Sequence, residues 1–259
     1  MSHEAHSKNC ILAEPCTLAN TAKCNARCSS YIATMGYNGL GGRVGAANVP
    51  AEYRRVTLAN SPARTEQAAA YKHAETYAHT FTRQFGDASD ERIKSLYLYS
   101  AEPGTGKTTT AAALLNEYIV RHYIGSIQRG LQPQERPGYF LDANEAQVLY
   151  TEFNRPKVPD DIAEPASREY YRRLQAAKLT PFVIIDDIGV RDATDGFRGD
   201  LHSVINHRVT NAMPTVYTSN VLMDDLATVF DRRLADRIRD MCIEIRFVGE
   251  SKRGLRKTA

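Results

Sequence analysis

The chain has 259 residues, of which 42% are hydrophobic and 24% charged, and its formal net charge at pH 7 is +3. This composition predicts a folded soluble protein, and the charge is too small to argue by itself for a nucleic-acid partner. No secretory signal is visible, and no apolar run approaches the roughly 20 residues of a membrane span. We therefore expect a cytoplasmic protein with no membrane partner, in a bacterium or in the host cell if the gene is phage-borne.

The N-terminal segment holds four of the five cysteines within 28 residues: Cys10, Cys16, Cys24 and Cys28. In a reducing compartment such a cluster indicates a metal site before it indicates disulfides. Four thiolates can close the tetrahedral shell of Zn²⁺, and His3 or His6 can replace one of them. The spacing contains no Cys-x2-Cys knuckle, so free thiols on a frayed terminus remain the alternative to the zinc site that we expect.

The segment after the cysteines is rich in glycine from residue 36 to residue 45, which predicts a loop or hinge. Ser61 and Pro62 form a good helix start, and apolar residues recur at helical spacing from Ala70 to Phe85. We expect three parts: a small cysteine-rich, partner-binding module over residues 1–50, a linker and packing helix over 51–94, and a main domain over 95–259.

The main domain alternates predicted strands with predicted helices. Apolar runs predict strands at 96–99, 139–142, 182–185, 215–218 and 243–247. Helical spacing predicts helices at 108–123, 144–153, 164–178, 200–211 and 229–241. Strands that alternate with helices indicate an α/β fold with a parallel sheet and helices on both faces.

The segment that follows the first strand, residues 101–108, reads Ala-Glu-Pro-Gly-Thr-Gly-Lys-Thr. Glycines in such a loop let backbone amides wrap phosphates, a lysine supplies charge for the β- and γ-phosphates, and a threonine hydroxyl reaches Mg²⁺ at the helix N-terminus. The first motif position is Ala101 instead of Gly. We expect these residues to hold ATP with Mg²⁺: Gly104, Thr105, Gly106, Lys107, Thr108 and Thr109.

Two acidic residues end the apolar strand at 182–185. Asp186 is predicted to lie at the carboxyl edge of the sheet, where a carboxylate can hold the hydration shell of Mg²⁺. Asp187 can orient or deprotonate the attacking water. Many ATPases carry Glu at this second position, so the shorter Asp187 predicts slow hydrolysis. Without the upstream phosphate loop, two acids that cap a loop would explain the pair equally well.

Polar residues also end the strand at 215–218. Asn220 can report the γ-phosphate by hydrogen bonding. In the helix that follows, Arg233 and Arg237 are four residues apart and share one face. An arginine there can reach the γ-phosphate of a neighbouring subunit. The alternative is a solvated helix laced by Asp236 and Asp240.

Five motifs in this order resemble the DnaC/DnaI-type replicative helicase loaders, which are P-loop AAA+ ATPases related to the initiator DnaA: residues 104–108, 186–189, 214–220, 233–239 and 247–253. The resemblance covers about residues 95–254. It implies that Asn220 is sensor 1, Arg237 the arginine finger with Arg233 as its companion, and Arg253 sensor 2. Only 12 residues follow Phe247, so no C-terminal helical lid is expected, as in loaders of this type.

The resemblance implies an ATP-dependent loader that binds a hexameric replicative helicase and places it on single-stranded DNA during replication initiation. ATP hydrolysis would be slow and stimulated by DNA or partner, and the chain would self-associate with ATP. The family also has an N-terminal helicase-binding segment, often with zinc, although the cysteine spacing departs from the known zinc sites of loaders. Cations and tyrosines at 154–157 and 168–173 can bind single-stranded DNA, or form an ordinary exposed helix.

Three other functions use the same phosphate loop. One is a transposition-helper ATPase of the IstB type, which would prefer duplex DNA and a transposase. The others are a small-molecule kinase and a nucleotide switch with negligible turnover. The sensor-like Asn220 and the pair Arg233 and Arg237 favour an oligomeric ATPase over a kinase.

Overall fold

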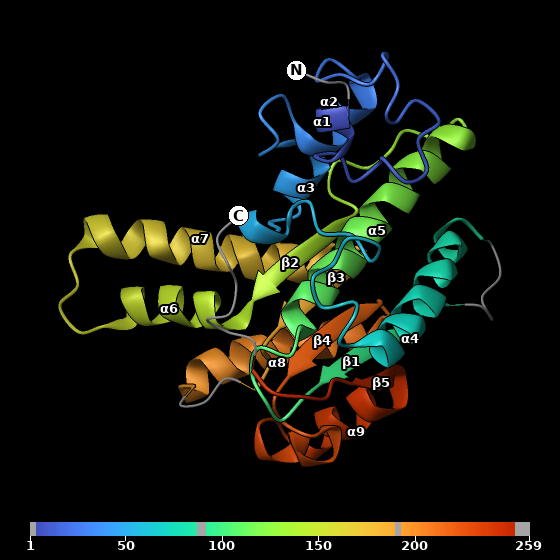
Figure 1. Cartoon of the computed structure of the whole chain (residues 1–259). Helices are drawn as coiled ribbons and strands as arrows, with labels where there is room; N and C mark the ends of the chain where they lie inside the picture. Colours follow the sequence, from blue (N-terminus) through green and yellow to red (C-terminus); the bar gives the residue numbers. More distant parts are fainter. Residues whose placement is uncertain (1–3, 87–91, 190–192, 252–259) are drawn as a thin grey trace. The chain divides into compact units, whose positions relative to one another are not determined.

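The computed structural model describes residues 4–86, 92–189 and 193–251 (Figure 1). Its contacts group into two compact units: unit 1 contains residues up to 93 together with 112–139, and unit 2 contains 94–111 and the residues from 140 onward. The division at residues 50 and 94 that the sequence suggests concerns function and stays a prediction. Within the described ranges, no helix is both long and apolar enough to cross a bilayer.

Unit 2 is built on a five-stranded parallel sheet with the order β2-β3-β4-β1-β5. The strands are β1 (Ser95–Tyr99), β2 (Gly138–Asp142), β3 (Phe182–Asp186), β4 (Thr215–Ser219) and β5 (Cys242–Arg246). Leu96 pairs with Val216 of β4 on one side and with Ile243 of β5 on the other. All five strands lie within one residue of their predicted positions. The buried strands β1 to β4 are recognisable because such parallel strands are short apolar runs, whereas the edge strand β5 is partly exposed.

The helices of unit 2 are the first turn of α5 (Lys107–Gln128), then α6 (Ala143–Asn154), α7 (Asp160–Leu179), α8 (Asp195–Thr210), the 3₁₀ turn η3 (Met223–Thr228) and α9 (Arg232–Met241). Asp142, Thr194 and Asp231 cap α6, α8 and α9 with their side-chain oxygens. Helix α7 begins four residues before its predicted start, because Asp160 and Asp161 favour a helix N-terminus. Helices α6 and α7 pack together as a hairpin (Figure 1).

A buried arginine stabilises the edge of the sheet at which strands β3 and β4 begin. Arg208 in the last turn of α8 has no exposed surface, and all five of its N–H donors are used. Its Nε donates to Thr215 Oγ1 at 2.8 Å. Its terminal amino groups donate to four carbonyls at 2.8 to 3.2 Å, those of Ala177, Thr180, Pro181 and Pro214. Arg208 therefore fixes the end of α7 to the starts of β3 and β4.

Unit 1 is helical. Its elements are α1 (Glu4–Ser7), α2 (Ser29–Met35), α3 (Gly42–Ala46), η1 (Ala51–Tyr53), α4 (Ala68–His79), η2 (Thr80–Phe85) and the part of α5 from residue 112. The predicted helix start at Pro62 is wrong, since residues 62–67 form turns and α4 begins at Ala68. The hydroxyl of buried Ser61 forms a hydrogen bond with the hydroxyl of buried Tyr71. Ser61 therefore contributes to the core and does not cap the helix.

The cysteine-rich segment belongs to unit 1 and is not set apart as a module of its own. Residues 8–28 consist mostly of turns.

Arg43 of α3 connects this helix to the residues that follow α5 and to α5 itself, all within unit 1. Its Nε and one amino group donate to the carbonyls of Gln134 and Pro133, at 2.8 and 2.9 Å. The guanidinium also lies 5.0 Å from the centre of the Tyr123 ring of α5.

Candidate nucleotide-binding site

The loop between β1 and α5 has the backbone geometry that phosphate binding requires. Gly104 and Gly106 have φ angles of +73° and +102°, in the region that only glycine enters freely. Lys107 begins α5 and is 8% exposed. Its Nζ donates to the carbonyls of Ser100 at 3.2 Å and Glu102 at 3.1 Å, and to Asn220 Oδ1 at 2.5 Å. The structure thus brings the predicted lysine and the predicted γ-phosphate reporter into direct contact.

The first acid of β3 lies beside the phosphate loop. Thr108 Oγ1 donates to Asp186 Oδ2 at 3.1 Å, and Thr218 Oγ1 donates to Asp186 Oδ1 at 2.6 Å. Asp186 is 6% exposed, and this burial, with the nearby charge of Asp142, raises the pKa of its carboxyl to about 7. A buried carboxylate beside a threonine hydroxyl is a hard oxygen donor set that suits Mg²⁺.

The second acid is held by one residue of β4 and one residue of α6. Asp187 has a φ of +58°, unusual for a residue other than glycine. Its backbone amide donates to Thr218 Oγ1 at 2.8 Å, and its Oδ2 accepts from Asn144 Nδ2 at 2.9 Å. Asp142, the cap of α6, accepts from the amides of Asn144 and Glu145. Burial raises the pKa of Asp142, and the charges of Glu145 and Asp187 raise it further.

Sequence analysis missed Asn144 and Asp142. A signal was available, since Asp142 ends β2, Asn144 follows it, and the carboxyl ends of parallel strands share one edge of a sheet. The missing information was the strand order, which places β2 next to β3.

The arginines of α9 are divided between two environments. Arg237 donates to Asn206 Oδ1 at 2.8 Å and Thr210 Oγ1 at 3.3 Å, both on α8. Arg233 is exposed. The ion pair with Asp236 is made by Arg239, which also lies 3.3 Å from Asp224. Predicted sensor 2, Arg253, lies outside the described residues.

The start of α9 borders a cavity of about 390 Å³. Asp231 lines it and bonds His202 Nε2 at 2.5 Å, while its other oxygen caps α9. None of the sequence-predicted site residues lines this cavity, so we do not assign the nucleotide to it.

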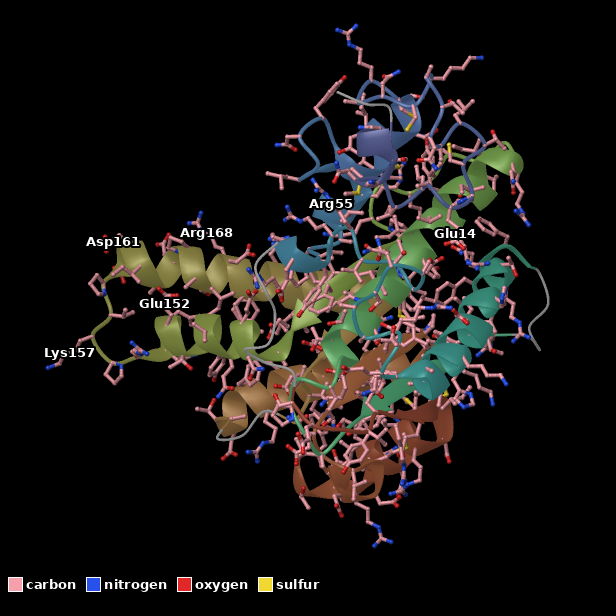
Figure 2. All side chains as sticks on the ribbon, in the orientation of Figure 1. Glu14, Arg55, Glu152, Lys157, Asp161 and Arg168 are labelled. Carbon is pink, nitrogen blue, oxygen red and sulfur yellow. The ribbon has the colours of Figure 1, made fainter. Side chains whose placement is uncertain are left out.

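The α6–α7 hairpin carries the cations and tyrosines considered for DNA. Arg168, Arg172 and Arg173 are all ion-paired with glutamates of the hairpin. The pKa of Glu169 falls to about 2 because Arg172 and Arg173 bond it. Tyr170 is fully buried, so it is not available to stack on a base, whereas Tyr171 is 56% exposed. Lys157 extends from the turn between the helices (Figure 2).

The four N-terminal cysteines are free thiols, Cys16 exposed and the others half-buried. Burial raises the pKa of Cys10, and the charges of the other three cysteines add to the rise. In residues 4–86, 92–189 and 193–251, however, no three His, Cys, Asp or Glu side chains are gathered as metal ligands. His6 has a buried Nε2 with no hydrogen-bond partner, and His3 lies outside the described residues.

Comparison with known proteins identifies relatives among replication factors. No family model matches the chain. The replicative helicase loader DnaI of Bacillus subtilis is 28% identical over 173 residues, which are 62% of this chain and 48% of that protein. The chain therefore matches about half the length of this curated relative.

Solved structures show the same fold. A DnaC helicase loader superposes with a TM-score of 0.53 at 20% identity, covering 77% of this chain and 100% of that chain. A replication initiator DnaA bound to AMPPCP and single-stranded DNA superposes with a TM-score of 0.50 at 15% identity, covering 78% of this chain and 51% of that chain. In sequence, motif order and fold, the chain is therefore similar to the replicative helicase loaders of the DnaC/DnaI type.

Proposed function

We propose that this chain is an ATP-dependent loader that places a hexameric replicative helicase onto single-stranded DNA in the cytoplasm. The observation that carries the proposal is a pair of hydrogen bonds at the carboxyl edge of the sheet: Lys107 donates to Asn220, and Thr108 donates to Asp186. We call these four residues the joined set. A phosphate ligand, a magnesium ligand and a γ-phosphate reporter are then adjacent. The named function of the DnaI relative supplies the partner class.

Each residue of this edge has a role in ATP hydrolysis. The amides of residues 104–109 and the Lys107 ammonium hold the phosphates, and Thr108 and Asp186 hold Mg²⁺, which neutralises phosphate charge when bound. Asp187 orients or accepts a proton from the attacking water. Its carboxylate is turned toward Asn144, and its shorter side chain fits a slow, stimulated ATPase. If a phosphate oxygen replaces Asn220 Oδ1 as an acceptor of Lys107, the Asn220 side chain is free to contact the γ-phosphate.

We propose that neighbouring copies complete one another's ATP sites. Arg237 lies on α9 with its guanidinium held by α8, and Arg233 is exposed one turn before it. Neither arginine is part of the joined set around Lys107. This arrangement supports action on a second subunit, with Arg237 as the finger and Arg233 as its companion. Arg253 remains the proposed sensor 2.

We propose that single-stranded DNA follows the α6–α7 hairpin. Tyr171 is exposed for base stacking, and the exposed Arg155 and Lys157 supply charge at the turn. The paired arginines of α7 make a smaller contribution than the sequence suggested, because glutamates already neutralise them.

We propose that the four N-terminal cysteines bind one Zn²⁺. The support for this proposal is the clustering of the four cysteines within residues 10–28 and the scarcity of regular structure in residues 8–28, which a bound metal ion would order. The described residues contain no assembled ligand group, so binding must draw the thiols closer.

The function is tested by measuring ATP hydrolysis alone, with single-stranded DNA, with duplex DNA and with the replicative helicase of the host cell. A loader is stimulated by single-stranded DNA or helicase and transfers the helicase onto a DNA bubble. Stimulation by duplex DNA alone would favour the transposition-helper function. Absence of helicase binding in the presence of ATP would overturn the proposal.

A further inference from the structure

The loop between α2 and α3, residues 36–41, presents apolar side chains to solvent. Tyr37 is 84% exposed, more than any other large apolar side chain in the described part of the chain, and Leu40 is 57% exposed. The residues beneath the loop are well buried: Tyr31, Met35 and Val44 are at most 6% exposed. The core of unit 1 is therefore complete without Tyr37 and Leu40.

The loop is held in one conformation by its backbone. Gly36 has a φ of +75°, and a Cβ on it would lie 2.9 Å from the Cα of Gly41. Gly42 has a φ of +59°, and a Cβ on it would lie 2.5 Å from the carbonyl carbon of Thr34. Only glycine tolerates this combination of angle and contact. The two exposed side chains consequently stand on a tight, pre-formed turn.

Two hydrogen bonds add to this constraint. The amide of Gly41 donates to the carbonyl of Met35 at 3.0 Å, and the amide of Leu40 donates to Asn38 Oδ1 at 2.9 Å. A loop that is ordered before binding loses little conformational entropy when a partner covers it. Exposed tyrosine on such a loop is also the side-chain type most enriched among interface hot spots, together with Trp and Arg.

The formal charge of the segment that carries the loop, and the position of Arg55, indicate the chemistry of its partner. Residues 1–56 contain six Lys or Arg and three Glu, so this segment has a formal charge of +3, equal to that of the whole chain. Arg55 lies against the loop, 3.5 Å from the Cβ position of Gly39, and its other amino group donates to Asn9 Oδ1 at 2.7 Å (Figure 2). A complementary surface is therefore an apolar pocket with carboxylates at its rim.

We infer that residues 36–41 are the docking element for the helicase: Tyr37 and Leu40 enter an apolar pocket on the helicase surface, and Arg55 pairs with an acidic group at its rim. This inference rests on the proposed loader function, and it assigns helicase binding to a defined loop of unit 1. The loop belongs to unit 1, whereas the residues that we propose for ATP belong to unit 2, so substitutions in the loop are expected to leave ATP affinity unchanged.

The test measures the affinity of the full chain for the host replicative helicase, with ATP, by titration calorimetry. Tyr37→Ser is expected to weaken binding by about 30-fold or more, as loss of a hot spot does, and Tyr37→Phe by less than about 3-fold. Arg55→Glu should weaken binding most at low salt. The matched control is Ile127→Ser, which removes a 51% exposed apolar side chain elsewhere in unit 1.

Unchanged thermal unfolding and ATP affinity show that the Tyr37→Ser protein is folded. If the unsubstituted chain does not bind the helicase, the loader function itself fails. If the unsubstituted chain binds and Tyr37→Ser and Leu40→Ser bind equally well, the loader function stands and the docking loop is refuted.

Discussion

Replacement of Lys107 by methionine tests the joined arrangement at the nucleotide site most directly. Methionine keeps an unbranched apolar stem and removes only the ammonium group. In the structure this group makes three hydrogen bonds, to the carbonyls of Ser100 and Glu102 and to Asn220 Oδ1. Bound phosphate must compete with these neutral acceptors for the ammonium.

The expected loss of ATP affinity follows from that exchange. Two charge-assisted contacts with phosphate contribute about 3–6 kcal/mol, at about 1.5–3 kcal/mol each. Giving up the present acceptors of Lys107 offsets part of this, because a bond from the ammonium to an uncharged oxygen is also charge-assisted. A net gain equal to one charge-assisted contact, about 1.5–3 kcal/mol, corresponds to roughly 10- to 150-fold weaker ATP binding in the Lys107→Met protein.

The measurement is titration of a fluorescent ATP analogue in excess Mg²⁺, with Lys178→Met as the matched control, because Lys178 lies in α7 outside the motif. Asn220→Ala and the double substitution complete a cycle. The two effects should not add, since the side chains are in contact at 2.5 Å. ATP affinity of Lys107→Met within about 3-fold of the control would refute the assignment of Lys107 to phosphate.

Four further predictions concern the catalytic acid, the subunit interface, the metal and pH. Asp187→Asn should bind ATP normally and lose stimulated hydrolysis in a steady-state phosphate-release assay; normal turnover would exclude Asp187 as the group that activates water. Arg237→Ala should also bind ATP yet lose stimulated hydrolysis, and mixing it with Lys107→Met should restore part of the activity; normal hydrolysis by both Arg237→Ala and Arg233→Ala would exclude a shared site. Elemental analysis of protein purified without chelator should find about one Zn²⁺ per chain, and a metal-free result would rule out the zinc site. Burial makes the pKa of Asp186 higher in the folded than in the unfolded chain. Without nucleotide and Mg²⁺, the folded state should therefore lose stability as pH rises from about 4 to about 7. Thermal unfolding measured across this pH range should show that Asp186→Asn removes the loss.

Most of unit 2 was predictable because its signals are local. A buried parallel strand is a short apolar run, and a phosphate loop is a fixed spacing of glycine, lysine and threonine. These signals placed β1 to β5 and the residues from Gly104 to Thr108 without knowledge of the tertiary structure. They do not contain the strand order, however. Asn144 was therefore missed, since its contact with Asp187 depends on β2 lying next to β3.

Other residues had side-chain environments that sequence type alone does not reveal. Arg208 reads as an ordinary cation in the last turn of a helix, yet it is buried with carbonyl partners from three segments. Tyr170 reads as a base-stacking residue beside Tyr171, yet it is buried and donates to Asp200. Neighbouring residues of a helix point in directions about 100° apart, so only the packing of α6 and α8 decides which tyrosine is exposed.

Thr218 connects the two acids at the end of β3 to the strand that leads to Asn220. Strand β4 lies between β3 and β1, so a side chain at its end can reach the strands on both sides. Thr218 bonds the carboxylate of Asp186 and the backbone amide of Asp187, and two residues later Asn220 bonds Lys107. A shift of the end of β4 would therefore move Asp186, Asp187 and Lys107 together, the residues that we propose as magnesium ligand, water-activating acid and phosphate ligand. If nucleotide draws Lys107 away from Asn220, as we propose, it acts on this same strand end, and β4 would then be central to the response of the site to ATP.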